Sequence, residues 1–347
     1  MKSVLFIAGI GINDRDVYGG MLAKNRFFYD YLKNKEINLK VIDTYVSEKK
    51  ILNRILSKLI INLKRIYILL LSFFYDEIII SDHAYKIISI LNKLNQSYKI
   101  TFFVVGGAFN QKLSQGILDK KKYYDIKHIY VETYKMKKDL LNLGLKNVER
   151  VPNFKTFNQK NKKYKKEINE PIKLFYIGRI HSKKGINLAV KALRKINKEK
   201  QKFILDFYGP INKEFNSHFL KEIKKNDYLN YCGCVDLVGE HKEYHKLSDY
   251  DLFIFPTFWP GEGFPGVIID SFILGIPVLA SDWHYNSEIV KDKYNGILFE
   301  PKKIDDLCNK LNYIYKNKEI LIRMSKNSYK SAKKYKTEKV LEILGLD

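Results

Sequence analysis

Residues 255–290 read FPTFWPGEGFPGVIIDSFILGIPVLASDWHYNSEIV, which predicts the end of a strand, a loop and a helix in succession. Glycine and proline interrupt the backbone between 260 and 267, so this part predicts a loop. The run VIIDSFIL predicts a helix over 267–274 that is closed by Gly275. A loop that opens directly into a helix offers unpaired N–H groups and the positive end of the helix dipole, which suits a phosphate group.

Two acidic residues accompany this predicted loop and helix. Glu262 lies in the loop, and Asp270 follows it eight residues later, about one turn inside the helix. Carboxylates at these positions can accept hydrogen bonds from sugar hydroxyls. The segment therefore predicts a site for a phosphorylated sugar, although the same residues are compatible with an ordinary strand, loop and helix whose two carboxylates are solvated.

The order Glu-Gly-Phe, an acid eight positions after the glutamate and then Gly-x-Pro-Val resembles the signature of retaining glycosyltransferases of family 4. Two departures from that signature are present. The second acid is Asp270 where the family usually has glutamate, and Pro265-Gly266 replaces Gly-Leu. The resemblance implies a GT-B fold, in which two Rossmann-like domains face a central cleft and a C-terminal helix crosses back to the first domain.

A second motif, Gly178-Arg179-Ile-His-Ser-Lys-Lys184-Gly185, begins at the end of the predicted strand 172–180 and leads into a predicted helix. Two cations at a strand end and a helix start can bind a diphosphate. The same pattern marks the donor diphosphate site of the resembling family, which implies this role for Arg179 and Lys184. The alternative is surface charge on a β–α turn.

The resemblance implies that Glu262, Arg179 and Lys184 are catalytic residues. It also implies that Glu262 hydrogen-bonds hydroxyls of the donor sugar and that Asp270 hydrogen-bonds the ribose. It implies a wider set of donor-binding residues, which are Gly20, Gly263, Phe264, Pro265, Gly266, Asp270, Tyr208, Gly209 and Val235. Many family members carry a histidine after the fourth strand, where this chain has VVGGAFN. Gly107 stands at that place, and His83 after the preceding strand is a candidate substitute, although a histidine at a strand end is more often structural.

Short apolar runs alternate with helical stretches along the whole chain, which predicts an α/β fold with parallel sheets. At 347 residues, the chain is long enough for two domains. We predict an N-terminal domain over 1–154, a Lys- and Asn-rich linker over 155–170, a nucleotide-sugar-binding domain over 171–325 and a terminal helix over 326–347 that packs on the first domain. The predicted strands are 4–8, 39–43, 77–81, 98–105, 127–132, 172–180, 203–209, 231–236, 251–256 and 276–281.

The net charge of +24 favours anionic partners such as nucleotide phosphates, or reflects a solvated lysine-rich surface. No zinc-finger or RNA-binding motif is found, so nucleic acid is not expected as a partner. Three cysteines form neither a disulfide framework nor a zinc spacing, which favours a reducing, cytoplasmic compartment. No cofactor and no metal are expected, because Arg and Lys can neutralise a diphosphate and no Asp-x-Asp lies near the proposed site.

Residues 49–75 predict a basic amphipathic helix. Lys50, Arg54, Lys58 and Arg65 recur at helical spacing, and Ile51, Ile55, Leu59 and Ile66 recur on another side. Such a helix fits an anionic membrane surface or a protein core, and the two alternatives stay open. The longest uncharged apolar run is too short to span a bilayer, so we expect no transmembrane segment. We expect a cytoplasmic protein that can lie on the inner face of the plasma membrane.

Together these features predict a retaining glycosyltransferase that moves a sugar from a UDP- or GDP-sugar to a saccharide acceptor. The resemblance implies a lipid-linked acceptor in bacterial capsule or exopolysaccharide assembly. One alternative is a GT-B-fold nucleotide-sugar epimerase, which would need no acceptor. Another is a non-catalytic subunit that docks on a membrane, against which the intact set of Arg179, Lys184, Glu262 and Asp270 argues.

Overall fold

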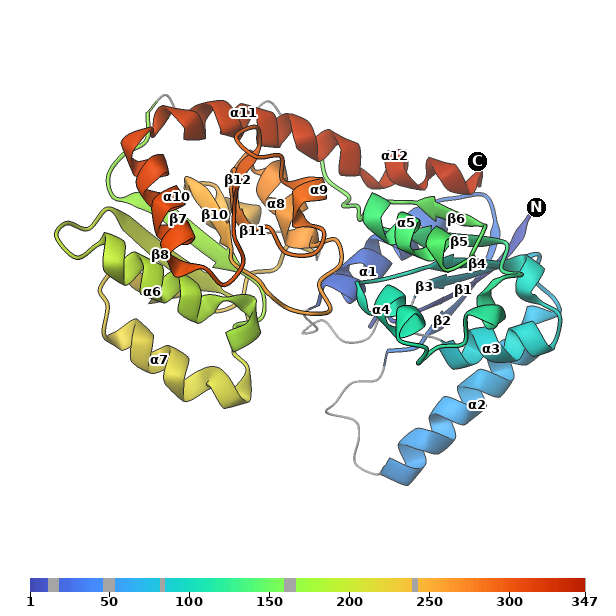
Figure 1. The fold of residues 1–347 in the computed structure, drawn as a ribbon. Coiled ribbons are helices and arrows are strands. Elements are labelled where there is room, and N and C mark those ends of the chain that lie inside the picture. Colours follow the sequence, from blue (N-terminus) through green and yellow to red (C-terminus); the bar gives the residue numbers. More distant parts are fainter. Residues whose placement is uncertain (12–18, 46–53, 82–84, 159–166, 239–242, 347) are drawn as a thin grey trace. The chain divides into compact units, whose positions relative to one another are not determined.

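The structure is a computed structural model that describes residues 1–11, 19–45, 54–81, 85–158, 167–238 and 243–346. These residues form two compact units (Figure 1). Unit 1 contains Met1–Phe154 and Thr337–Asp347, and unit 2 contains Lys155–Lys336. Each unit is built on its own parallel β-sheet, so the predicted α/β fold with two Rossmann-like units is confirmed.

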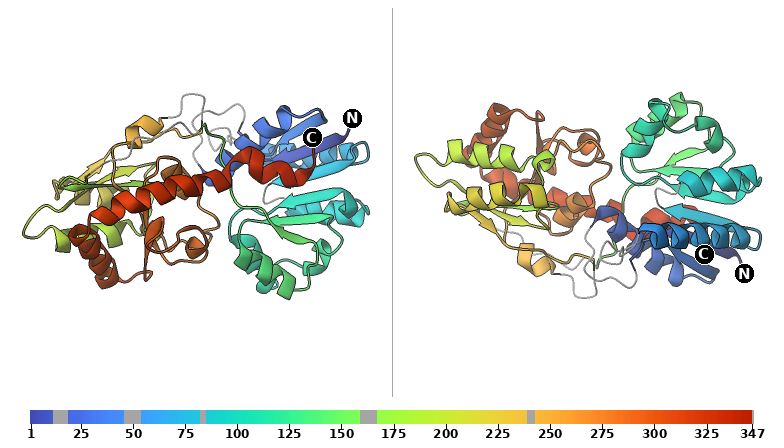
Figure 2. Two further views of the ribbon diagram at one scale, coloured as in Figure 1. Left: turned by 90° about the horizontal axis from the view of Figure 1, so that it is seen from above. Right: turned by 90° about the horizontal axis from the view of Figure 1, so that it is seen from below.

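Unit 1 is built around six parallel strands in the order β2-β1-β3-β4-β5-β6. Their central members are fully buried, because helices cover both faces of the sheet (Figure 2). The strands are β1 (Ser3–Ala8), β2 (Asn38–Asp43), β3 (Glu77–Ser81), β4 (Ile100–Phe103), β5 (His128–Val131) and β6 (Val148–Arg150). The helices are α1 (Gly20–Lys33), α2 (Arg54–Ser72), α3 (Tyr85–Lys93), α4 (Ala108–Ser114), α5 (Tyr134–Asn142) and, from the C-terminal segment, α12 (Thr337–Leu341).

Unit 2 repeats this plan with the strand order β12-β11-β10-β7-β8-β9. The strands are β7 (Ile172–Ile177), β8 (Phe203–Tyr208), β9 (Leu229–Tyr231), β10 (Leu252–Phe255), β11 (Val278–Ser281) and β12 (Gly296–Phe299). The helices are α6 (Ile186–Ile196), α7 (Asn216–Lys224), α8 (Gly266–Ile273), α9 (Asn286–Ile289), α10 (Ile304–Lys316) and α11 (Glu319–Ala332).

The strand order of unit 2 reverses between β7 and β10. The chain runs outward from β7 to β9, returns to β10 on the other side of β7 and continues to β12. β7 and β10 are paired in parallel, so their carboxyl ends lie side by side. In open parallel sheets, ligands bind beyond the strand ends at such a reversal. The loops that leave β7 and β10 carry the two motifs that the sequence singles out.

Three strands differ from the sequence prediction. β9 ends at Tyr231, where the predicted strand 231–236 begins, and Gly233 has a positive φ of 75° that an extended strand does not allow. β6 and β12 lie outside the predicted strands. Both are short edge strands, and so few residues carry no recognisable periodicity.

The C-terminal segment is divided between the units. α11 ends at Ala332, a turn of 3₁₀ helix follows over Lys333–Tyr335, and Lys336 is extended with ψ 132°. The predicted terminal helix over 326–347 is therefore interrupted at Lys336, and only the part from Thr337 onward belongs to unit 1.

The two chain connections leave unit 2 next to each other. The backbone N–H of Lys155 donates to the carbonyl oxygen of Tyr335 at 2.9 Å. Lys155 belongs to unit 2 and is buried, although the sequence predicts that it begins a linker over 155–170. Residues 159–166 of that predicted linker lie outside the described residues.

Candidate functional site

Two glycines allow the loop after β7 to lie against the ends of strands β8 and β10. A Cβ atom on Gly185, which has a φ of 76°, would lie 2.0 Å from the carbonyl oxygen of Pro256 at the end of β10. A Cβ atom on Gly209 at the end of β8 would lie 2.1 Å from the carbonyl oxygen of Gly178. Only glycine fits at such approaches. The backbone N–H of Phe258 also donates to the Lys183 carbonyl oxygen at 3.0 Å, which joins the loops after β7 and β10 directly.

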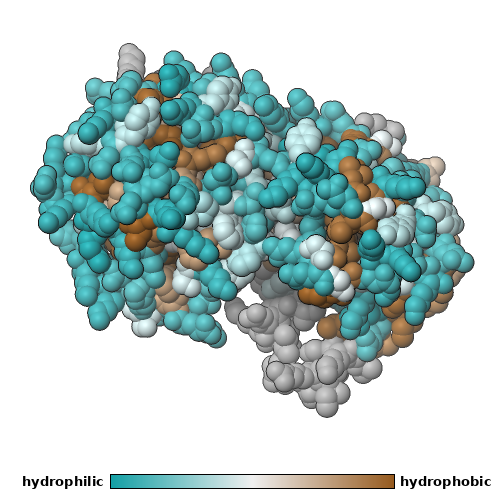
Figure 3. All heavy atoms as spheres, viewed as in Figure 1, coloured by the Kyte–Doolittle hydropathy of each residue, from teal (hydrophilic) through white to brown (hydrophobic). Residues whose placement is uncertain are grey.

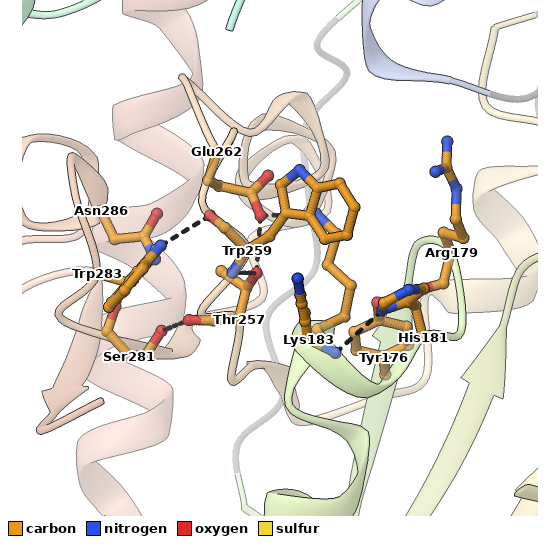
Figure 4. A network of polar contacts seen from close by, with 11 residues as sticks. Tyr176, Arg179, His181, Lys183, Thr257, Trp259, Glu262, Ser281, Trp283 and Asn286 are labelled. Atoms are coloured by element: carbon orange, nitrogen blue, oxygen red, sulfur yellow. Dashed lines mark hydrogen bonds and ion pairs between the residues drawn. The ribbon is translucent and has the colours of Figure 1, made fainter. Parts of the chain in front are cut away.

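This contact brings Lys184 and Glu262 together, although 78 residues separate them in sequence. Lys184 Nζ lies 2.6 Å from Glu262 Oε2, and Thr257 Oγ1 donates to the same oxygen at 2.8 Å (Figure 4). Both charged side chains are mostly buried. A charge-assisted hydrogen bond at this distance fixes the orientation of the carboxylate. Glu262 Oε1 accepts no hydrogen bond from the residues that the structure describes.

The loop that carries Glu262 is fixed by further hydrogen bonds. The backbone N–H of Glu262 donates to the Trp259 carbonyl oxygen at 3.1 Å, and Trp283 Nε1 donates to that same oxygen at 2.8 Å (Figure 4). Ser281 Oγ donates to the Thr257 carbonyl oxygen at 2.5 Å. Thr257 and Ser281 were not singled out from the sequence. Their position at the carboxyl ends of β10 and β11 is the signal that could have indicated them.

Arg179 is exposed and its backbone is held in place. The buried Tyr176 hydroxyl donates to the Arg179 carbonyl oxygen at 2.9 Å, and burial raises the pKa of this tyrosine above its ordinary value. The guanidinium group of Arg179 has no hydrogen-bond or ion-pair partner among the described residues. A positioned and unpaired guanidinium beside a strand end is well suited to bind an anion.

His181 lies between Arg179 and Lys184 in the same loop. Its Nδ1 accepts a hydrogen bond from the backbone N–H of Lys183 at 3.0 Å and so caps the short turn Ser182–Lys184. The imidazole ring contacts Trp259 edge-on, at 5.2 Å between ring centroids. Burial, followed by the charges of Arg179 and Lys183, lowers the pKa of His181 from its ordinary 6.5. The imidazole is therefore neutral at pH 7 and serves as a hydrogen-bond acceptor.

Residues 263–266 form the predicted entry to α8. Gly263, Phe264 and Pro265 are buried, and Gly266, the first residue of α8, is half-buried. The Phe264 ring packs edge-on against Tyr335, with 5.3 Å between the centroids. This contact joins the loop to the place where the chain leaves unit 2.

Asp270 lies one turn inside α8, as the sequence predicts, and only 2 % of its surface is exposed. Its Oδ2 lies 2.9 Å from Lys155 Nζ, and its Oδ1 accepts a hydrogen bond from the Tyr244 hydroxyl at 2.7 Å. Burial and the nearby Asp270 carboxylate raise the pKa of Tyr244 well above its ordinary value. Neither Lys155 nor Tyr244 was singled out from the sequence, because each lies far from Asp270 along the chain.

Tyr208, Gly209 and Val235 lie around the end of β8. The Tyr208 and Tyr250 hydroxyls are 2.9 Å apart, and the Tyr250 hydroxyl donates to Asp206 Oδ2 at 2.5 Å. Tyr208 and Val235 pack in the same buried apolar cluster. The backbone N–H of Gly209 donates to the Gly233 carbonyl oxygen at 2.7 Å.

The remaining predicted residues belong to unit 1. Gly20 is the first residue of α1 and is exposed, and a Cβ atom there would meet no atom within 4 Å. Gly107 immediately precedes α4. His83 lies outside the described residues. Within unit 2, the structure brings Lys184 and Glu262 into contact in one loop cluster that also carries Arg179.

The described residues contain no group of three or more His, Cys, Asp or Glu side chains that could hold a metal ion. Among the described helices, none is long and apolar enough to cross a membrane.

Comparison with known proteins gives both a family match and structural matches. A family model described as glycosyl transferases group 1 matches residues 157–331, slightly more than half of the chain. An uncharacterized glycosyltransferase of Methanocaldococcus jannaschii is 29% identical over 200 residues, which are 53% of this chain and 48% of that protein. The chain thus spans about half the length of this relative.

A UDP-Gal:alpha-D-GlcNAc-diphosphoundecaprenol alpha-1,3-galactosyltransferase of Escherichia coli is 35% identical over 81 residues, which are 23% of this chain and 20% of that enzyme. The crystal structure of HepE from Anabaena in complex with UDP matches with a TM-score of 0.71 at 13% identity, over 99% of this chain and 98% of that one. At such low identity, the structural match shows the fold alone.

Proposed function

The chain belongs to the glycosyl transferases group 1 family, and from this premise we propose that it is a retaining glycosyltransferase that uses a nucleotide diphosphate sugar as donor. The observation that carries the proposal is the cluster at the ends of β7 and β10. There a fixed Lys184–Glu262 pair lies in the same loop cluster as the unpaired guanidinium of Arg179. A cation pair beside a held carboxylate is suited to a substrate that joins a diphosphate to a sugar.

In this proposal, Arg179 and Lys184 bind the diphosphate and stabilise the charge that develops on it. The bond between the anomeric carbon and the β-phosphate oxygen breaks, and both of its electrons go to that oxygen. The acceptor hydroxyl forms the new bond on the same face of the sugar, and its proton passes to the leaving phosphate. Positioned cations that meet the developing charge supply the main acceleration of such a step.

Glu262 holds the donor sugar in this proposal. Its Oε2 is occupied by Lys184 and Thr257, which leaves Oε1 to accept a hydrogen bond from a sugar hydroxyl. Because the carboxylate is already oriented, little conformational freedom is lost when the sugar binds.

Asp270 is proposed to contact the ribose, with Tyr208 and Val235 of the same unit near other parts of the donor. Each carboxylate oxygen has two acceptor positions. Lys155 and Tyr244 each occupy one of these positions, so Asp270 keeps one acceptor position on each oxygen. Since Arg179 and Lys184 supply the positive charge that the diphosphate needs, we propose that transfer requires no divalent ion.

The acceptor is proposed to be a lipid-linked saccharide in surface polysaccharide assembly. The Escherichia coli relative supports this proposal, because its name specifies a UDP-sugar donor and a diphosphoundecaprenol-linked acceptor. A cytoplasmic enzyme with such an acceptor would act as a peripheral protein on the inner face of the plasma membrane.

The test is a panel of UDP- and GDP-sugars, with thermal stability and donor turnover measured with and without Mg²⁺. We expect one donor to stabilise the protein without metal, and this effect to disappear in Arg179→Ala. Lys191→Ala is the control, because Lys191 lies on the exposed face of α6 and loses the same charge. No response to any nucleotide sugar would refute the proposal, and epimerisation of the donor without an acceptor would replace it with a nucleotide-sugar epimerase.

A further inference from the structure

Helix α2 of unit 1 presents a row of large apolar side chains to solvent. Their exposed fractions lie between 44 and 78 %, whereas Ile68 and Ser72 on the same segment are buried. The exposed side chains recur at the spacing of one helical face and continue just past the end of the helix. They are Leu63, Ile66, Tyr67, Leu70, Phe73 and Phe74, and we refer to them as the α2 face.

Part of this region can be seen in the space-filling view. In Figure 3, hydrophobic residues lie among hydrophilic ones at the lower right, where Figure 1 places α2. A contiguous exposed apolar surface of this kind marks a contact with a partner or a membrane, whereas isolated exposed apolar residues need no explanation. The sequence left open whether the apolar side of this helix packs in a core or on a membrane. Ile66, which belongs to that apolar side, is exposed to solvent and so is not part of a core.

A cation borders the α2 face. Lys40 Nζ lies 5.8 Å from the centroid of the Tyr67 ring. The sequence of α2 is itself basic, with Arg54, Lys58, Lys64 and Arg65 and no acidic residue, but Lys64 Nζ donates to the Asp43 carbonyl oxygen at 2.9 Å and so is held against β2.

Tyr98 also has a cation beside its ring, and this cation, Lys99, donates to the carbonyl oxygen of Ser72 at the end of α2. Tyr98 is 62 % exposed, and Lys99 Nζ lies 5.9 Å from its ring centroid. Aromatic rings flanked by cations are typical of the boundary between lipid headgroups and acyl chains.

We infer that the α2 face is a docking surface for an anionic lipid bilayer, with the helix lying in the plane of the interface. Apolar and aromatic side chains would enter the headgroup region, while the bordering Lys40 and Lys99 meet lipid phosphates. A second copy of this chain fits less well, because a face-to-face dimer would bring together the cations at the borders of the two faces, Lys40 and Lys99 of each copy.

This surface would hold the enzyme where a lipid-linked acceptor is presented, and in that respect the inference rests on the proposed function. Its physical basis, however, lies in unit 1 alone, whereas the proposed donor cluster lies in unit 2. The two proposals can therefore fail separately.

The experiment is co-sedimentation of the full-length chain with vesicles of phosphatidylcholine alone or mixed with phosphatidylglycerol. We expect binding to the anionic vesicles, weaker binding at high salt, and a fall of about tenfold or more in the double variant Leu70→Gln/Phe74→Gln. Ile117→Gln/Leu141→Gln is the matched control, because these residues are also exposed in unit 1 but lie outside the α2 face. We expect this control to bind like the unchanged chain.

Three results would overturn the inference. They are no binding of the unchanged chain to anionic vesicles, an equal loss in both double variants, and a change from dimer to monomer in Leu70→Gln/Phe74→Gln without any vesicle binding. Nucleotide-sugar turnover is measured in parallel. Turnover without vesicle binding rejects the docking surface alone, and vesicle binding without any nucleotide response rejects the proposed function while the surface stands.

Discussion

Lys155 Nζ lies 2.9 Å from Asp270 Oδ2, and both side chains are almost fully buried. Lys155 is the first residue of unit 2, and its backbone N–H bonds to Tyr335 beside the second chain connection. Asp270 lies on α8, which follows the loop of Glu262. The ion pair therefore ties the helix of the proposed donor site to the place where both connections leave unit 2.

Lys155→Met should destabilise unit 2 by about 3–5 kcal/mol, because it leaves the Asp270 carboxylate buried without its partner. Urea unfolding followed by tryptophan fluorescence measures this change for unit 2, since both tryptophans of the chain, Trp259 and Trp283, lie in that unit. Lys155→Met/Asp270→Leu is the control, because it removes both charges and should recover most of the loss. An unchanged unfolding midpoint in Lys155→Met would show that the pair does not stabilise the unit.

Glu262→Gln should lower the rate of sugar transfer by about 100-fold or more, because a neutral amide no longer pairs with Lys184 or holds the donor sugar as a carboxylate does. Thr257→Val is the graded comparison. It keeps the volume but removes one hydrogen bond to Oε2, and a loss of about 1 kcal/mol corresponds to roughly fivefold in rate. Steady-state transfer assays rank the variants. Equal rates in Glu262→Gln and the unchanged chain would remove Glu262 from the mechanism.

Gly185→Ala should weaken both folding and nucleotide binding. A Cβ atom would lie 2.0 Å from the Pro256 carbonyl oxygen, so the loop of Lys184 would have to move away from β10. Gly233→Ala is the matched control, because Gly233 has nearly the same positive φ but no atom within 4 Å of an added Cβ. The positive φ alone costs about 1–3 kcal/mol in each variant. Calorimetry and nucleotide titration should show a larger loss for Gly185→Ala, and equal losses would mean that the close approach is unimportant.

Much of the fold and part of the site could be predicted from the sequence. The apolar runs of the buried strands and the glycine-marked loops are local patterns, so nearly all of the predicted strands coincide with observed ones. The placement of Lys184 and Glu262 in one site also follows from local motifs, because each lies in the loop after a central strand of a sheet whose order reverses between those strands. Their direct ion pair was not predicted.

The other contacts depend on tertiary packing. Lys155 stands in a polar stretch that predicts a linker, and nothing local indicates that it meets a carboxylate 115 residues away. An amphipathic pattern shows that a helix has an apolar side but does not show whether that side meets a core. The exposure of Ile66 on α2 could therefore only come from the structure.

His181 should make the stability of unit 2 depend on pH in a defined direction. Burial, and then the charges of Arg179 and Lys183, lower its pKa from the ordinary 6.5, so the folded protein binds this proton less tightly than the unfolded chain does. The stability that neutral His181 contributes is fully present above pH 6.5 and is lost as the pH falls through the lowered pKa.

His181→Asn separates this effect from the other titrating groups. An asparagine oxygen can accept the hydrogen bond from the Lys183 N–H but does not take up a proton in this range. Between about pH 7.5 and pH 5, we expect the unfolding midpoint of the unchanged chain to fall further than that of the variant. If both fall equally, protonation of His181 costs the folded state nothing, and the loop of Arg179 and Lys184 tolerates a third positive charge.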